Sequence, residues 1–218
     1  MDKLKKDSLT ELVYTKITDM ILNKDLVPGD KLVIKDLANL LGVSQTPVKA
    51  AVQRLVHEGV AEQQNSSGTY LKVFSNRDME HLYAVRAGLE SVSLRLCMER
   101  FEPKEIEAIT SVFDIFQDDK PIDPVQYQQV DRRFHEKILL LSNNPIIIDF
   151  IRNFDFVLKC YQLGLLRPPE ETLPEHREII GSIRNGDIDK ACRLLMHHHL
   201  RTKNALAASG VQERQSPE

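Results

Sequence analysis

The stretch Asp30–Tyr70 constrains the fold more than any other part of the chain, because it joins two short helical patterns through a glycine turn. Apolar residues at positions i, i+3 and i+4 predict a first helix with one apolar stripe: Leu37, Leu40 and Leu41. Gly42 follows at once and can adopt the positive φ that ends a helix. Ser44 is a suitable N-cap for a second helix. The inward face of that helix is apolar: Val48, Ala51, Val52 and Leu55.

The second predicted helix carries polar side chains on its outer face: Gln45, Thr46, Lys49 and Gln53. A short turn with glycine between two helices is typical of the helix-turn-helix, whose second helix enters the DNA major groove. Gly59 is expected to end this helix, and a β-hairpin wing is expected over Val60–Gln64 and Thr69–Val73. A helical hairpin with only a packing role is the alternative. We favour DNA binding because turn, polar face and wing occur together.

The pieces VPGDKL, LANLLGVSQTPVKAAVQRLVHEGV and GTYL resemble the winged helix of GntR-type bacterial transcription regulators. The resemblance covers the first third of the chain. In this region we expect the following residues to bind DNA: Lys35, Ser44, Gln45, Thr46, Lys49, Gln53 and Gly68. The family commonly has Arg where this chain has Gln45, and Arg-Glu where it has Lys49-Ala50. An operator sequence therefore cannot be transferred from relatives.

The charge of the chain is weak for a DNA-binding protein. The formal net charge is −3, yet residues 1–75 carry 10 Lys+Arg against 9 Asp+Glu, a balance of +1. Because so few phosphate contacts are possible for one copy, we expect a homodimer on a two-fold symmetric operator. No apolar run approaches the roughly 20 residues that span a bilayer. The three cysteines are unclustered, which favours reduced thiols in a cytoplasmic protein with no membrane partner.

The remainder of the chain is expected to be helical throughout. A long helix is predicted over Met79–Phe101 from an apolar pattern of threes and fours: Leu82, Val85, Leu89, Val92 and Leu96. Asp123-Pro124 and Asn144-Pro145 each combine an N-cap residue with proline at the first helical position. The predicted fold is thus mainly α, with a winged helix-turn-helix over 1–75, a bundle of about six helices over 76–210 and a disordered tail over 211–218.

Four further pieces resemble the FCD domain, the helical effector-binding domain of the FadR-like branch of GntR regulators: YAVRAGLE, DRRFHEKI, SNNP and HREIIGSIRNGDIDKACRLLMHHHL. Together with the wing they cover nearly the whole chain in the expected order. The resemblance implies a ligand-responsive transcription regulator, with repression as the expected mode. It also implies a small organic acid as effector.

A metal site is predicted inside the bundle. Asp131 and His135 lie four residues apart, on one helix face that continues to Ile138. His176 precedes an apolar stripe, and His198 is the inward member of three consecutive histidines. Zn²⁺ is the first expectation, with Ni²⁺, Mn²⁺ or Fe²⁺ as alternatives. An Asp–His hydrogen bond among core histidines is the other interpretation of the spacing; the FCD resemblance implies the metal set.

Arg86 has two interpretations. It can form an ion pair with Glu90, four residues on, or it can bind the carboxylate of an effector, and we favour the effector. A metal-dependent enzyme and a purely structural metal are the competing functions, since histidines with an open coordination position can activate water. No HExxH pattern is present and no Glu is expected on the buried faces, so we predict a regulator and no catalytic residues.

Overall fold

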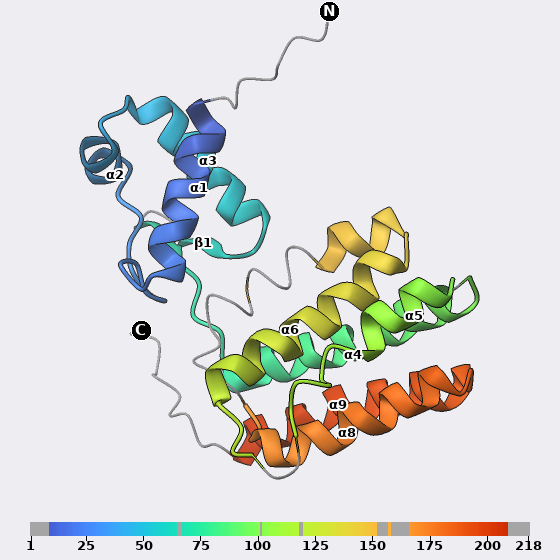
Figure 1. Cartoon of the computed structure of the whole chain (residues 1–218). Helices are drawn as coiled ribbons and strands as arrows, with labels where there is room; N and C mark the ends of the chain where they lie inside the picture. The colour runs from blue at the N-terminus through green and yellow to red at the C-terminus, as the bar shows by residue number, and fades with distance from the viewer. Residues whose placement is uncertain are drawn as a thin grey trace, which may run out of the picture. The chain divides into compact units, whose positions relative to one another are not determined.

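The computed structural model describes residues 9–64, 67–100, 102–117, 120–151, 157 and 166–208. The described chain is mainly helical, with a single two-stranded sheet (Figure 1). It divides into two compact units, one ending at Phe74 and one that begins at Ser75 and includes the described residues 75–151 and 166–208. None of the described helices is long and apolar enough to cross a membrane.

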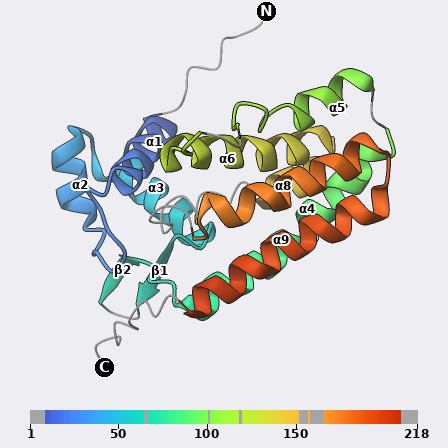
Figure 2. The same ribbon diagram turned by 60° about the horizontal axis from the view of Figure 1, so that its bottom comes forward.

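The first unit has three helices and a β-hairpin, as predicted. The elements are α1 (Leu9–Leu22), α2 (Ile34–Leu41), α3 (Gln45–His57), β1 (Ala61–Gln64) and β2 (Gly68–Leu71). The strands pair antiparallel with Ala61 opposite Leu71, and Figure 2 shows the hairpin. The apolar faces of α1 and α3 supply most of the buried core: Val13, Ile17, Ile21, Val48, Ala51, Val52 and Leu55. Asn65 and Ser66, which connect the two predicted strands, lie outside the described residues.

Two details of the helix-turn-helix differ from the prediction. Leu40 is 68% exposed, because α2 buries Leu37 and Ala38 instead of a three-leucine stripe. Ser44 occupies the N-cap position of α3 but makes no side-chain capping hydrogen bond. Pro47 is the third helical residue and has no N–H to donate, which removes one of the two usual donors to an N-cap side chain. Gly42 ends α2 with φ +67°, as expected.

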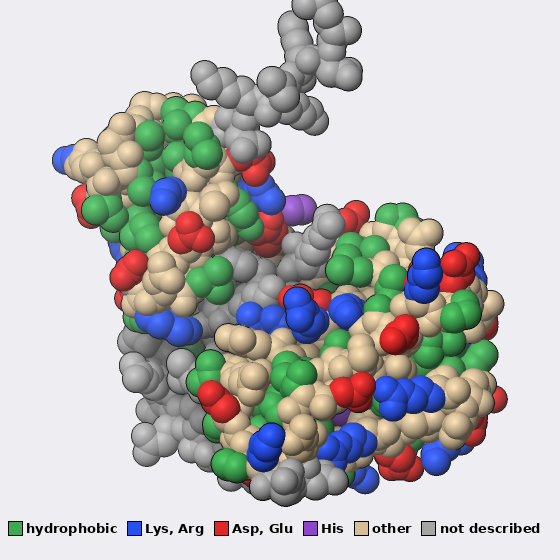
Figure 3. All heavy atoms as spheres, in the orientation of Figure 1, with side chains coloured by type: hydrophobic (Ala, Val, Ile, Leu, Met, Phe, Trp, Pro, Cys, Tyr) green, Lys and Arg blue, Asp and Glu red, His purple; other side chains and the backbone are tan. Residues whose placement is uncertain are grey.

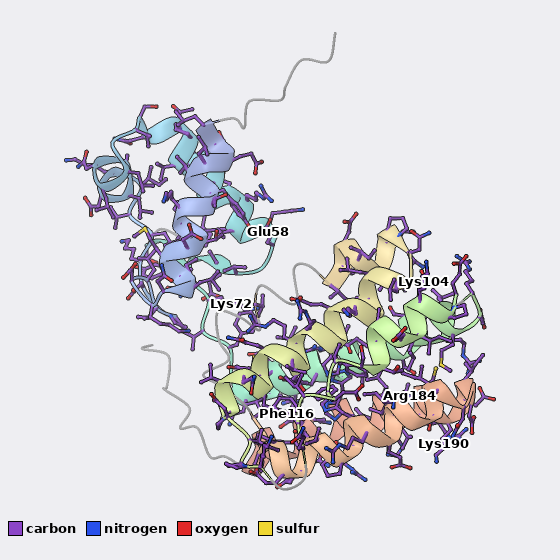
Figure 4. All side chains as sticks on the ribbon, viewed as in Figure 1. Glu58, Lys72, Lys104, Phe116, Arg184 and Lys190 are labelled. Carbon is purple, nitrogen blue, oxygen red and sulfur yellow. The ribbon has the colours of Figure 1, made fainter. Side chains whose placement is uncertain are left out.

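The second unit is a helical bundle with about six helices in its described part. It contains α4 (Asn76–Met98), α5 (Pro103–Thr110), α6 (Pro124–Leu141), a helical segment over 145–151, α8 (Pro169–Arg184) and α9 (Ile188–Ala208). Helix α4 packs along α9 and α6, and α8 packs on α9 (Figure 2). Arg184 donates to the Thr110 carbonyl at 3.0 Å, which fastens α8 to the end of α5 (Figure 4).

Side-chain caps set several helix starts in this unit. The Asp123 carboxylate accepts from the amides of Val125 and Gln126, as the Asp-Pro pair predicted. Helix α4 begins at Asn76, three residues before the predicted start, because Ser75 and Asp78 form a reciprocal capping box. The same helix ends at Met98, three residues before the predicted end at Phe101. Of the helix whose start Asn144-Pro145 predicts, residues 145–151 and 157 are described and helical.

The inward face predicted for α4 is wrong. Val85 and Val92 are 45% and 50% exposed, while the buried face carries small and polar residues beside a few large ones: Met79, Tyr83, Ala87, Glu90, Ser91, Ser93, Leu94 and Cys97. The Ser91 hydroxyl donates to the Cys192 carbonyl of α9 at 3.1 Å, so small residues permit a close approach of the two helices. Hydrophobic periodicity predicts that the most apolar stripe of a helix is buried, but in α4 a different stripe is buried.

Candidate functional site

The four predicted metal ligands come together inside the second unit. Asp131 and His135 lie on α6, His176 on α8 and His198 on α9, and one ligand-type atom from each lies within 4.8 Å of the others. The Nε2 atoms of His135 and His176 are 3.4 Å apart. The Asp131 Oδ1 atom lies 3.4 Å from His176 Nε2 and 3.9 Å from His135 Nε2. The histidines are buried and the Asp131 side chain is 27% exposed.

The Nδ1 atom of each histidine in this cluster contacts a side chain that is not one of the four predicted ligands; we call these side chains the outer partners. His135 Nδ1 lies 2.5 Å from Glu90 Oε2, and His198 Nδ1 lies 2.8 Å from Glu175 Oε2. His176 Nδ1 lies 3.0 Å from the Tyr127 hydroxyl. Such partners fix the ring orientation of a ligating histidine and leave its other nitrogen to bind a metal.

The residues predicted to contact DNA lie on the surface of the first unit. The side chains on α2, the turn and α3 are all exposed: Lys35, Ser44, Gln45, Thr46, Lys49 and Gln53. Gly68 begins β2 with φ +117°. Arg54 of α3 does not add free charge, because it pairs with Glu11 and Glu58. On the face drawn in Figure 3, Lys and Arg side chains are interspersed with Asp and Glu, in keeping with the small net charge.

Two protein families account for most of the chain. Residues 9–71 match the bacterial regulatory proteins of the gntR family, and residues 81–202 match the FCD domain. The chain is a GntR-family transcription regulator with a C-terminal FCD domain. Its relatives are transcription regulators and not enzymes.

Three known relatives illustrate the distance within the family. The regulator is 22% identical to the uncharacterized HTH-type regulator YdhC of Bacillus subtilis over 208 residues, covering 91% of this chain and 92% of YdhC. It is 28% identical to Escherichia coli McbR over 150 residues, 68% of each chain. It is 31% identical to the Nta operon transcriptional regulator of Aminobacter aminovorans over 127 residues, 58% and 60% of the two chains. The solved E. coli McbR/YncC structure has the same fold, with TM-score 0.66, 21% identity and coverage of 93% and 98%.

The electrostatics of the cluster in this GntR regulator favour neutral histidines. Burial lowers the pKa of His135 to about 3 and that of His198 to about 4, and it holds the pKa of His176 well below its usual value. Phe113 stacks on the His176 ring at 4.4 Å between centroids, so aromatic surface replaces water there. Burial raises the pKa of Asp131 to about 7, although Arg86 acts in the opposite direction. The three imidazoles are therefore neutral, and ionisation of the Asp131 carboxyl is unfavourable in this buried position. The four residues themselves carry no positive charge that would balance an ionised Asp131.

Glu90 and His199 are members of the site that the sequence analysis missed. Glu90 is fully buried, and its carboxylate accepts from Arg86 Nε at 2.5 Å and from His199 Nε2 at 2.8 Å, besides its contact with His135. Burial alone would raise the pKa of Glu90, but Arg86, His135 and His199 hold it well below its usual value. The expectation that no Glu lies on a buried face is therefore wrong. Its position, three residues after Ala87 and four before Leu94, was the available signal.

Glu175 is the second missed carboxylate. Arg167 binds it through two guanidinium nitrogens, at 2.8 and 2.7 Å, and Arg201 donates to it at 2.6 Å. Burial would raise the pKa of Glu175, yet the hydrogen bonds from Arg167, His198 and Arg201 lower it. An ionised Glu175 is thus available to hold the His198 Nδ1–H.

The donor set fits a divalent cation. Three imidazole nitrogens and one carboxylate converge from three helices, and each imidazole has an outer partner. A second group of ligand-type residues, Glu90, His135 and His199, also lies close together. Arg86 already supplies a positive charge to Glu90, so we assign this second group to the orientation of His135 and not to another cation.

Proposed function

We propose that the FCD domain of this regulator holds a divalent metal on Asp131, His135, His176 and His198, with Zn²⁺ first and Ni²⁺, Mn²⁺ or Fe²⁺ as alternatives. The observation that carries the proposal is the convergence of these four donors with a partner behind each histidine. A bound metal would supply the missing positive charge and a coordination position for an anionic ligand. Three nitrogens and one oxygen are a usual donor set for Zn²⁺.

The effector in this proposal is a small carboxylate that is recognised by Arg86. The predicted ion pair with Glu90 is present, and the Arg86 side chain retains 14% exposure. A guanidinium has further donors with which it can bind a carboxylate in a forked geometry. Because Glu90 contacts both Arg86 and His135, a ligand on Arg86 would affect the metal site through one intervening side chain.

For the first unit, we propose that Gln45 and Lys49 set base preference while Lys35 and Thr46 position the phosphate backbone. Ser44 and Gln53, exposed at the start and on the outer face of α3, and Gly68 in the wing complete the proposed surface. The uncapped Ser44 hydroxyl remains able to bind a phosphate oxygen. The proposed domain limits are 1–75 and 76–210, with 211–218 as a tail.

We also propose that the regulator acts as a cytoplasmic, homodimeric repressor. Two subunits would double the phosphate contacts of a weakly charged DNA-binding domain. The exposed Val85 and Val92 on α4 give the FCD domain an apolar surface that a second copy could cover. Sedimentation and DNA footprinting of the parent and of Val92→Asp test the dimer, and Val92→Asp should weaken it. A parent that sediments as a monomer and protects one asymmetric half-site with full affinity would contradict the proposal.

Elemental analysis of the purified full chain, combined with mass spectrometry of co-purifying small molecules, tests the metal and the effector together. The proposal expects close to one metal ion per chain and a carboxylate that changes the affinity for selected DNA. A metal-free protein that gains neither stability nor bound metal when Zn²⁺, Ni²⁺, Mn²⁺ or Fe²⁺ is added would overturn the metal site. Bound metal without any response to carboxylates would leave a structural metal.

A further inference from the structure

Lys31 lies beside the wing, in the segment before α2. Its backbone forms an isolated antiparallel bridge with Tyr70 of β2. Two neighbouring hydrogen bonds fix this pairing: Leu32 N–H donates to the Thr69 carbonyl at 2.8 Å, and Leu71 N–H donates to the Asp30 carbonyl at 2.8 Å. The segment therefore acts as a third strand beside the hairpin, and the position of Lys31 relative to the wing is well defined.

The side chain of Lys31 extends toward the tip of the wing. A Cβ atom built on Gly68, two residues closer to the hairpin turn than Tyr70, would lie 2.9 Å from Lys31 Cε and 3.6 Å from Lys31 Nζ. The ammonium lies 5.5 Å from the centre of the Tyr70 ring. The absence of a side chain at Gly68 thus leaves room for the lysine, and the Tyr70 ring provides a favourable surface for its charge.

Among the described residues of this unit, Lys31 is an exposed cation that can contact DNA. Arg54 is paired with Glu11 and Glu58, whereas Lys31 is exposed and forms no ion pair within the described residues. With a balance of only +1 over residues 1–75, each unpaired lysine contributes a large share of the attraction to phosphate. Lysines in such positions bind the backbone and carry no sequence information.

We propose that Lys31 is a further phosphate-contacting residue, and that Gly68 contributes to DNA binding by leaving space for the Lys31 side chain, besides adopting the positive φ of its position. The inference rests on the proposed DNA-facing surface formed by α3 and the wing. It gives Gly68, which has no side chain of its own, a physical role in that surface.

The test measures how the affinity of the full-length protein depends on salt, with a duplex that the parent protein selects from random DNA. Lys31→Gln should lower affinity similarly for selected and mixed-sequence duplexes, and it should reduce the slope of log K against log salt by about 0.9 per contact. Lys31→Arg should restore the slope. The matched control is Lys16→Gln, which removes an exposed lysine from α1 and should leave the slope unchanged.

A double-mutant cycle tests the part of Gly68. Gly68→Ala should weaken binding in the parent and add little in the Lys31→Gln background, with thermal melting measured for each variant because φ is +117° at this position. Equal losses in both backgrounds would overturn the role of Gly68. An unchanged salt slope for Lys31→Gln, while Lys49→Gln still weakens binding, would overturn the Lys31 contact alone. If both Lys31→Gln and Lys49→Gln bind DNA as tightly as the parent, the proposed DNA-facing surface is wrong as well.

Discussion

The Glu90 carboxylate of α4 and the His135 imidazole of α6 are in contact in the buried interior, with Oε2 and Nδ1 2.5 Å apart. Arg86 and His199 bind the same carboxylate, so one acidic residue links α4, α6 and α9. His135 points its other nitrogen at His176 and Asp131. Glu90 therefore controls the orientation of a candidate ligand although it is not itself part of the four-residue cluster.

Glu90→Gln is expected to lower metal affinity by roughly 10–100-fold, the range usual for partners of ligating histidines. The amide keeps the size of the carboxylate but removes the charge that holds the His135 Nδ1–H and balances Arg86. Competition with a chromophoric chelator measures the affinity. Glu99→Gln, at the exposed end of α4, is the control and should bind metal like the parent. Parent-like affinity in Glu90→Gln would contradict the assigned role.

His135→Ala and His198→Ala are each expected to weaken metal binding by more than the roughly 10–100-fold of an outer-partner change, because they remove donor atoms. They should also abolish the rise in melting temperature that metal gives, since the unfolded chain has no formed site. His197→Ala is the matched control, because His197 neighbours His198 in sequence but is exposed. The prediction fails if all three variants retain the same metal content.

Asp131→Asn is expected to affect stability and metal binding in opposite directions. Burial raises the pKa of Asp131 to about 7 in the folded protein, above its ordinary value. The Asp131 carboxyl therefore lowers the free energy of unfolding of the parent as pH rises from about 4 to 7, and this decrease is complete above pH 7. At pH 8 the free energy of unfolding of the metal-free variant should be about 1 kcal/mol higher than that of the parent. The difference is small because the Asp131 side chain is 27% exposed, so water still stabilises its charge in part. At pH 4 the difference should vanish.

Urea titrations of the metal-free proteins at the two pH values measure this difference. Metal affinity of Asp131→Asn should fall at pH 8, because the amide is a weaker ligand than a carboxylate. Equal free energies of unfolding of parent and variant at pH 8 would contradict the prediction, because burial would then not disfavour the ionised Asp131 carboxylate.

The sequence predicts those features that depend on local chemistry. The start of α6 follows from Asp123 and Pro124, and the convergence of His135, His176 and His198 follows from helical period and the FCD pattern. The buried face of α4 was missed because a polar cluster and a close helix contact outweigh the preference for large apolar residues. Glu90 lies on that face only because Arg86, one turn earlier on α4, and His135 and His199 on two other helices compensate its charge.

Gln45→Arg is expected to change the preferred half-site and not merely to raise affinity. Gln binds adenine in a bidentate geometry, whereas Arg favours guanine, and each such pair is worth roughly 1–3 kcal/mol of discrimination. Gln45 is exposed at the first position of α3, so the substitution should leave the fold intact. Selection from random DNA with both proteins measures the preference. Identical selected sequences would remove Gln45 from the base-reading set.

Arg86 requires a subtler substitution than alanine. Arg86→Ala would leave Glu90 buried without its cation, and breaking a buried pair in this way costs about 3–5 kcal/mol, so metal binding through His135 would suffer as well. Arg86→Lys keeps a positive charge near Glu90 but lacks the planar fork that binds a carboxylate in two places. We therefore expect Arg86→Lys to fold and to retain its metal, while the carboxylate effector changes DNA affinity far less than in the parent.

The change in DNA affinity that the effector causes in the parent should be about 5-fold or more, the lower end of usual couplings between sites. Fluorescence anisotropy of labelled DNA, measured with and without carboxylate at fixed metal content, gives this ratio. If Arg86→Lys and the parent respond equally, the guanidinium serves only to balance Glu90, and the effector must be recognised elsewhere in the FCD domain.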